Sequence, residues 1–366
     1  IETVGNGIPR IDFLGNTQGA LKLEPQRTNL ITYSEDFSNG NWAKYGTTVT
    51  SGFTSPDGSL NAFKLVEDTN NSKHFISRNN LFTPDGVTRD YSIFVKEGEK
   101  RYIFITNVTT TNNDINCAVF DTRDGVFTNT NNPTYISNRN VTTLSNGWYR
   151  IDFTSNVNSF SYDNFYIGIS SSETMSGVSY QGDGTSGVYI YGAQLEVGSY
   201  PTSYIPTQGS AVTRVAESCE QTVPDGIINS SEGVLFAEFE IPDLSTSLAY
   251  PISIYGTGAA IQIYYRPISQ TISFLSSVGG VQYLYHSNIN PLVMHKVALV
   301  YKNNEYSAFA DGVLLDRQNS GIVPAPNTLN VLGLKDSGSS NFIGKVKDVK
   351  IYNTALTDQE LISLTS

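Results

Sequence analysis

Charged residues and sulfur-containing residues are scarce in this sequence. Only 16% of its 366 residues are charged, and it has 2 methionines and 2 cysteines. Two cysteines exclude a disulfide framework, and we expect Cys117 and Cys219, which we place in different domains, to remain thiols. No apolar run is long enough to span a bilayer. The net charge of -11 opposes binding to nucleic acid or to an anionic membrane surface.

Motifs of catalysis are equally scarce. The three histidines are scattered, without an HExxH or Cys-His cluster, and there is no Gly-x-Ser-x-Gly turn or glycine-rich phosphate loop. Glu238 and Glu240 share one face of an expected strand. This arrangement is weakly similar to the carboxylate pair of glycosidases. The apolar residues that alternate with them explain both glutamates as the outer face of a half-buried strand. We therefore expect no enzyme, with a glycan depolymerase or lyase as the alternative.

Aromatic residues and turn formers are abundant, with 22 Tyr, 18 Phe and 31 Gly. Candidate strands follow one another about every ten residues, with Asn-Gly and Asp-Gly turns between several of them. The only helical signal is at the end, where Thr357 to Glu360 has capping-box spacing and Leu361 and Leu364 form an apolar stripe. The sequence predicts an all-β protein with two tandem antiparallel β-sandwich (jelly-roll) domains and a short C-terminal helix.

Composition shifts divide the chain. Pro25 cannot lie in a central strand, so we expect the first strand at Leu30–Tyr33, close to a last strand near Tyr189–Leu195. Because the sequence begins at Ile1 without methionine or signal peptide, we expect it to come from a longer polypeptide. The expected division is an arm at 1–22, a first domain at 23–208, a linker at 209–232 and a second domain at 233–366.

The C-terminal run from Phe342 to Leu361 resembles the final strand and short helix of laminin-G-like, concanavalin-A-like lectin domains. The hairpin from Phe309 to Leu314 resembles theirs as well. Together they place the resemblance at about residues 230–366. This family binds sugars or proteins, so the resemblance implies a β-sandwich and leaves its ligand open.

The first domain resembles the carbohydrate-binding-module jelly roll of bacteriophage tail and fibre proteins. The motifs that carry this resemblance are Leu23–Phe37 with Trp42 soon after it, Gly147–Arg150, Gly192–Glu196 and the exit Tyr200–Thr207. The resemblance implies a receptor-binding or capsid-decorating protein on the virion surface. Its partners would be bacterial surface polysaccharide and other virion subunits, in a homo-oligomer that fibre architecture suggests is a trimer. The alternatives are a purely structural particle module and a secreted bacterial carbohydrate-binding protein.

Sugar recognition combines an aromatic ring with carboxylate, amide or guanidinium groups nearby. Several candidates also have a structural interpretation: Trp42 would cover the end of the sandwich, residues 180–187 would form a solvated loop, and Tyr264 with Arg266 would lie on an ordinary solvent face. The candidate ligand-binding residues are Trp42, Tyr45, Tyr162, Tyr166, Tyr180, Asp183, Tyr264 and Arg266.

A structural calcium ion is the one cofactor that the resemblance brings in, because related lectin-like domains often hold one with loop carboxylates and carbonyls. Glu35 and Asp36 are the candidate ligands. The alternative interpretation places both in a solvated turn. Where calcium-binding relatives carry a carboxylate pair near the last strand, this chain has Gly192–Gln194.

Overall fold

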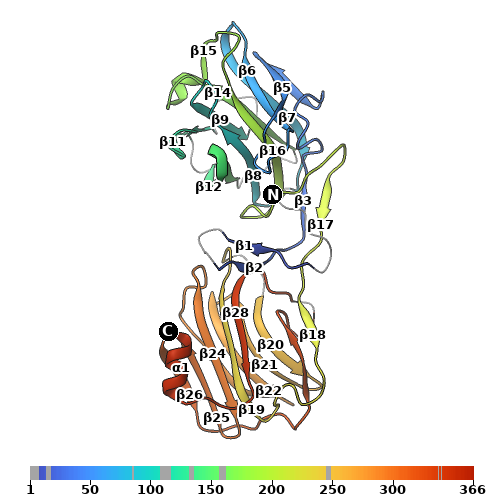
Figure 1. Ribbon diagram of the computed structural model, residues 1–366, viewed down its shortest axis with the longest axis vertical. Coiled ribbons are helices and arrows are strands. Elements are labelled where there is room, and N and C mark those ends of the chain that lie inside the picture. The colour runs from blue at the N-terminus through green and yellow to red at the C-terminus, as the bar shows by residue number, and fades with distance from the viewer. Residues whose placement is uncertain are drawn as a thin grey trace. The chain divides into compact units, whose positions relative to one another are not determined.

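The computed structural model describes residues 8–13, 18–84, 86–107, 117–131, 136–155, 162–244, 249–336, 338 and 340–366, with only the backbone of Tyr162 and Asp163. The chain forms two compact units (Figure 1). Unit 1 contains residues 26–215, and unit 2 contains the described residues from 8 to 25 together with 216–366. Each unit is an antiparallel β-sandwich, which confirms the expected fold class.

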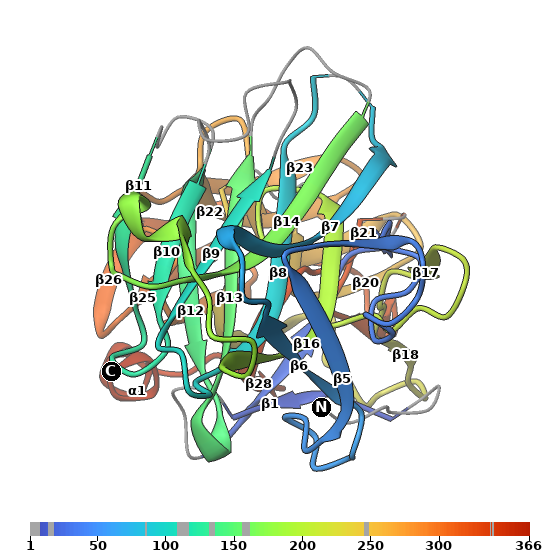
Figure 2. The same ribbon diagram turned by 90° about the horizontal axis from the view of Figure 1, so that it is seen from above.

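Unit 1 consists of two antiparallel sheets, and Figure 2 shows β7, β14, β9 and β10 of the first sheet side by side. The first sheet contains, in spatial order, β11 (Val126–Thr130), β10 (Cys117–Asp121), β9 (Tyr102–Asn107), β14 (Tyr162–Ser170), β7 (Asn71–Phe82) and β15 (Ser179–Gln181), with β4 (Trp42–Tyr45) also paired to β7. The second contains β12 (Ser137–Thr143), β13 (Trp148–Ser155), β8 (Arg89–Lys96), β16 (Gly187–Val197), β6 (Ala62–Glu67) and β5 (Thr47–Phe53). Two short 3-10 turns, η1 (Ser145–Gly147) and η2 (Met175–Val178), connect strands.

The core of unit 1 follows from the two-residue period of its strands. Ile167 and Ile169 of β14 are fully buried between the sheets, as is Phe153 of β13. Phe153 stacks on Tyr91 of β8, with ring centroids 4.9 Å apart and planes at 6°. This alternation sends the intervening side chains to the two outer faces of the sandwich.

The chain enters and leaves unit 1 through neighbouring segments. β3 (Arg27–Asn29) pairs with β17 (Val212–Arg214), so the first strand lies earlier than Leu30–Tyr33, where we expected it. The reason is the buried amide of Asn29, whose Nδ2 donates to Ala193 O and Ile205 O. The expected proximity to the last strand holds, because Leu30 N donates to Leu195 O at 2.9 Å.

Unit 2 also consists of two antiparallel sheets. One contains β1 (Ile11–Asp12), β2 (Ala20–Leu23), β28 (Gly344–Tyr352), β19 (Glu232–Glu240), β24 (His295–Lys302), β25 (Glu305–Ala310) and β26 (Val313–Gln318). The other contains β18 (Glu220–Thr222), β27 (Leu329–Gly333), β20 (Ala249–Gly256), β21 (Ala259–Arg266), β22 (Thr271–Val278) and β23 (Val281–His286). Isoleucine, phenylalanine and tyrosine side chains from both sheets fill the space between them.

The described residues from 8 to 24 are part of unit 2 and do not form the expected separate arm. Strand β2 pairs with β28, where Leu21 lies opposite Val346 and Leu23 opposite Gly344. The side chain of Leu23 is buried in the core of unit 2. The two paired strands are more than 300 residues apart in the sequence. A local sequence pattern therefore cannot predict that β2 extends this sheet.

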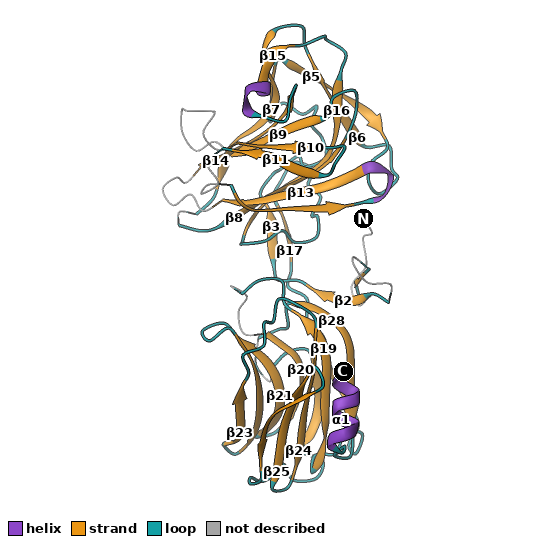
Figure 3. Ribbon diagram, turned by 90° about the vertical axis from the view of Figure 1, so that its left-hand side faces the viewer, coloured by secondary structure: helices purple, strands orange, loops and turns teal. Residues whose placement is uncertain are grey.

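The C-terminal helix α1 (Asp358–Thr365) lies on the outer side of the sheet that contains β24 and β25 (Figure 3). Thr357 accepts from Glu360 N, and the Glu360 carboxylate accepts from Thr357 N, so the predicted capping box is confirmed. Leu361 is buried against the sheet. In the part of the chain that the structure describes, no helix is long and apolar enough to cross a membrane.

Candidate ligand-binding face

The outer face of the first sheet of unit 1 carries a row of aromatic side chains. Because Ile167 and Ile169 point inward, their neighbours on β14 point outward. The strand register aligns one residue from each of β4, β7, β14, β9 and β10 across this face. The row contains Tyr45, Phe75, Gly168, Phe104 and Val119.

The next row, two residues along, combines a tyrosine with small polar side chains. It contains Ala43, Ser77, Tyr166, Thr106 and Cys117. Ser77 and Thr106 flank Tyr166 on the two neighbouring strands, and both are buried. Their hydroxyl groups have no hydrogen-bond partner among the described residues.

Three rings of this face form a continuous stack. The Tyr45 ring lies 4.8 Å from that of Phe75 at 17°, and the Phe75 ring lies 5.1 Å from that of Tyr166 at 20°. Tyr45 is 48% exposed, and Tyr166 is half-buried. Burial raises the pKa of Tyr166, and the neighbouring Tyr45 phenol adds to this effect. The Tyr166 phenol thus keeps its proton at neutral pH and can donate to a ligand beside the stack.

Gly168 makes room for this arrangement. A Cβ atom at this position would lie 2.3 Å from two ring carbons of Phe104 and 2.7 Å from His74 O. The Phe104 ring therefore occupies the space over the β14 backbone that any side chain at position 168 would need. The result is an apolar floor between the ring stack and β10.

A pocket of about 350 Å³ lies on this floor. Two rings of the stack, Phe75 and Tyr166, line it together with residues of η2 and β15. Its lining residues are Lys73, Phe75, Phe104, Thr106, Cys117, Asn131, Tyr166, Met175, Ser176, Val178 and Ser179. The lining is mainly apolar, with a few hydroxyl, amide and amino groups, the composition typical of small-molecule sites.

Tyr45 and Tyr166 are thus brought together by the structure, whereas Trp42 is not part of this face. Trp42 is fully buried, packs 4.9 Å from Phe37, and donates from Nε1 to Tyr33 O at 2.8 Å. The candidate role of Trp42 in ligand binding is therefore wrong, because β4 alternates and its Trp42 side faces the core. The side chain of Tyr162 lies outside the described part of the chain.

Tyr180 and Asp183 serve the structure of unit 1 itself. The Tyr180 hydroxyl donates to the buried Glu67 carboxylate, to which Lys100 is also paired at 3.0 Å. Asp183 accepts from the backbone N of Thr185 and Ser186. These bonds lower the pKa of Asp183, with Ser186 as the largest cause. Both side chains thus have partners within unit 1, and their role in ligand binding stays a prediction.

Tyr264 and Arg266 project from the outer face of their sheet in unit 2. The predicted alternation is confirmed, since Ile261 and Ile263 are fully buried in the core. Tyr264 is only 8% exposed and stacks on Tyr250 at 5.2 Å. Arg266 Nη1 donates to His286 Nε2 at 2.8 Å. The Tyr264 ring is therefore covered, and this pair stays a prediction as a ligand site.

The carboxylates of Glu35 and Asp36 have separate hydrogen-bond partners. Glu35 accepts from the Tyr191 hydroxyl at 2.8 Å, whereas Asp36 accepts from Ser38 N at 3.1 Å and closes a turn. Among the described residues, no group of three or more His, Cys, Asp or Glu side chains is placed to hold a metal ion. The two residues do not form a shared donor set, and calcium binding stays a prediction.

The carboxylates considered for catalysis are held in ion pairs. Glu238 is paired with Lys347 at 2.8 Å and Glu240 with Lys345 at 3.3 Å. Each carboxylate is thus already engaged by a lysine of the neighbouring strand β28. This arrangement favours the structural interpretation of the two glutamates.

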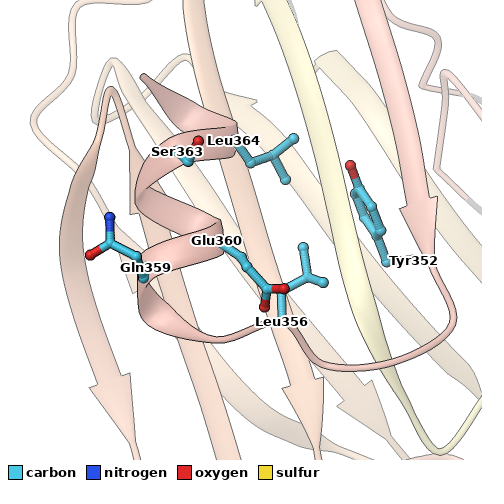
Figure 4. A pocket seen from close by; sticks show the side chains of 6 residues that line it. All are labelled: Tyr352, Leu356, Gln359, Glu360, Ser363 and Leu364. Atoms are coloured by element: carbon cyan, nitrogen blue, oxygen red, sulfur yellow. The ribbon is translucent and has the colours of Figure 1, made fainter.

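A second hollow lies along α1 in unit 2 (Figure 4). Figure 4 shows Leu364 pointing from the helix toward Tyr352, while Gln359 points to the opposite side. Glu360, which also lines the hollow, is engaged in the capping box. The hollow thus follows from the packing of the helix on the sheet, and its lining combines two leucines with Tyr352, Gln359, Glu360 and Ser363.

Phe75, Phe104 and Thr106 are the site residues that sequence reasoning missed. Each alternates with a buried isoleucine, Ile76 or Ile105, so their outward direction was readable from the two-residue period. Their proximity could not be predicted from the sequence, because β14 lies between β7 and β9 in the sheet and brings them together.

The match to a protein family concerns unit 2. A family model described as the concanavalin A-like lectin/glucanases superfamily matches residues 242–362. This match confirms the concanavalin-A-like resemblance of unit 2. No curated protein sequence matches the chain.

Solved structures are similar only at a distance. The CBM40 module of Ruminococcus gnavus IT-sialidase bound to α2,3-sialyllactose is 15% identical with a TM-score of 0.34, covering 41% of this chain and 97% of that chain. The SAP-like pentraxin of Limulus polyphemus is 14% identical with a TM-score of 0.32, covering 40% and 73%. Domains LG4-5 of the mouse laminin α1 chain are 11% identical with a TM-score of 0.27, covering 78% and 89%. Likenesses this low carry no argument about the ligand of this chain.

Proposed function

We propose that this chain is a noncatalytic glycan-binding protein and that the aromatic face of unit 1 is its binding site. The observation that carries the proposal is the partly exposed stack of Tyr45, Phe75 and Tyr166 beside a pocket of about 350 Å³. Aromatic rings bind the apolar faces of pyranoses, and phenol and threonine hydroxyls can bond to sugar hydroxyl groups. The lectin-like family match of unit 2 supports the same class of ligand.

The biological setting that we propose is a bacteriophage particle, in which the chain is a receptor-binding or decorating component. The support is the resemblance of the entry and exit motifs of unit 1 to tail and fibre proteins. Its ligand would then be a bacterial surface polysaccharide, and its partners would be other virion subunits. A homotrimer would present several weak sites together, which raises avidity without any new contact.

The binding site is tested by removing one ring of the stack. In Tyr166→Ala we expect about tenfold weaker glycan binding, because an aromatic contact contributes about 0.5–1.5 kcal/mol. A glycan array identifies the ligand, and titration calorimetry measures its affinity. The matched control is Tyr189→Ala, which removes a half-buried tyrosine from the opposite sheet, where it packs 5.0 Å from Phe53. Absence of glycan binding, or equal losses in the two variants, would contradict the proposal.

The particle setting has its own test. The purified protein is expected to compete with phage for adsorption to host cells, and Tyr166→Ala to compete less than Tyr189→Ala. Competition by both variants to the same extent would count against a role of this face in attachment.

A further inference from the structure

The pocket beside the ring stack combines an apolar floor with one buried hydroxyl that has no partner. Phe104 is 3% exposed and Cys117 is 4% exposed, and both lie next to Thr106 in the register of β9 and β10. Met175 and Val178 of η2 also line the pocket and pack with Phe104 and Cys117. A methionine adapts its shape to small apolar groups. The pocket thus suits a substituent that ends in a methyl group.

Thr106 adds one polar requirement to this pocket. It is 1% exposed, and its Oγ1 has no hydrogen-bond partner among the described residues. Backbone bonds of the sheet leave the side chain on the outer face, where it lines the pocket. A threonine hydroxyl both donates and accepts, so an entering amide can bond to it through its oxygen or its N–H. A purely apolar group would leave this hydroxyl unpaired, which is unfavourable.

We propose that the pocket selects the acetamido group of an N-acetylated sugar. This inference rests on the proposed glycan binding of the same face. The methyl group would contact Phe104 and Met175, the amide would bond to Thr106, and the pyranose ring would lie against Tyr166. A sugar with a hydroxyl group in place of the acetamido group would leave the apolar floor in contact with water and gain only the Thr106 bond.

The proposal is tested with matched pairs of oligosaccharides. The probes are β1,4-linked tetramers of N-acetylglucosamine and of glucose, and N-acetyllactosamine with lactose, titrated into the full chain by calorimetry. We expect the N-acetylated member of at least one pair to bind about tenfold more tightly. Thr106→Val keeps the side-chain shape and removes the hydroxyl, and it is expected to reduce this preference to about threefold or less.

Ser77→Ala is the matched control, because it removes the other unpaired hydroxyl next to Tyr166, which does not line the pocket. It is expected to keep the preference. Both tryptophans of the chain lie in unit 1, so their fluorescence checks that each variant is folded. A preference unchanged in Thr106→Val overturns the assigned role of Thr106.

A second measurement follows the pocket itself. Cys117 lines the pocket and is buried, whereas Cys219 belongs to unit 2 and is exposed, and neither is in a disulfide. The N-acetylated tetramer is expected to slow alkylation of Cys117 at least threefold and to leave Cys219 unaffected.

The possible failures can be told apart. Equal affinity for both members of each pair, with both weakened by Tyr166→Ala, overturns the acetamido proposal and leaves glycan binding at this face intact. Failure of all four probes to bind overturns the acetamido proposal, and only an additional absence of binding on the glycan array removes the proposed function with it.

Discussion

Burial governs the acidic side chains on the outer face of the second sheet of unit 1. Asp90 and Asp152 lie there on the neighbouring strands β8 and β13, diagonal to one another, and both are at most 2% exposed. Burial raises the pKa of Asp152 to about 6, although Asn140 donates to it and Arg150 lies near. Burial, followed by the charges of Asp152 and Glu196, raises the pKa of Asp90 well above its usual range.

We expect Asp152→Asn to change how the stability of unit 1 depends on pH. Because the folded state holds the proton of Asp152 up to about pH 6 and the unfolded state only to about pH 4, this residue favours folding at low pH. That contribution is lost as the pH rises from about 4 to 6, and it amounts to about 3 kcal/mol. The free energy of unfolding of the variant minus that of the parent should thus be larger at pH 7 than at pH 4. Urea unfolding followed through tryptophan fluorescence measures this difference.

Asp121→Asn is the control with the opposite sign. Burial acts to raise the pKa of Asp121, but hydrogen bonds from Arg101 and from backbone N–H groups lower it overall. Its stabilisation is present above about pH 4 and is lost as the pH falls. The same pH trend in both variants would contradict the assignment to buried charge.

At the scale of the element, the strands and the helix were readable because their signals are local. The capping box of α1 needs only Thr357 and Glu360 at the right spacing, and the structure forms both of its bonds. The period of β21 correctly separated Ile261 and Ile263 from Tyr264. The position of β3 was not readable, because it is decided by what the Asn29 side chain meets in space.

Thr357→Ala should loosen α1 and leave the sandwich of unit 2 folded. The variant loses the side-chain acceptor of Glu360 N, and loss of such a cap costs about 1 kcal/mol. Hydrogen exchange of the α1 amides, read by mass spectrometry, is expected to become about fivefold faster. Thr354→Ala, an exposed threonine just before the helix, is the control, and equal acceleration in both variants would speak against the cap.

At the scale of the whole molecule, unit 2 is built from two stretches of sequence that are separated by unit 1. Arg10 lies near the N-terminus, yet its Nε donates to Glu217 Oε1 at 2.6 Å and its Nη1 to Glu24 Oε2 at 2.8 Å. All three residues belong to unit 2. The N-terminal segment is therefore built into the sandwich that the C-terminal half of the chain forms.

Arg10→Ala should destabilise unit 2 by about 2 kcal/mol, because it removes a partner from the buried Glu24 carboxylate. Hydrogen exchange in peptides that cover β2 and β28 is expected to become faster, with unit 1 unchanged. Arg123→Ala provides the comparison, since Arg123 forms an exposed pair with Glu97 in unit 1 and should have little effect. An effect of Arg10→Ala confined to unit 1 would refute this assignment.

The sequence by itself determined the all-β class, the two sandwiches, the C-terminal helix and the face to which most side chains point, because each of these depends on neighbours within a few residues. Only the tertiary structure decided which aromatic rings are accessible. Trp42 and Tyr45 lie three residues apart on one short strand, yet the first is fully buried and the second is 48% exposed. Exposure depends on what the other strands bring alongside, and here β7, β14 and β9 bring Phe75, Tyr166 and Phe104 together from distant parts of the chain.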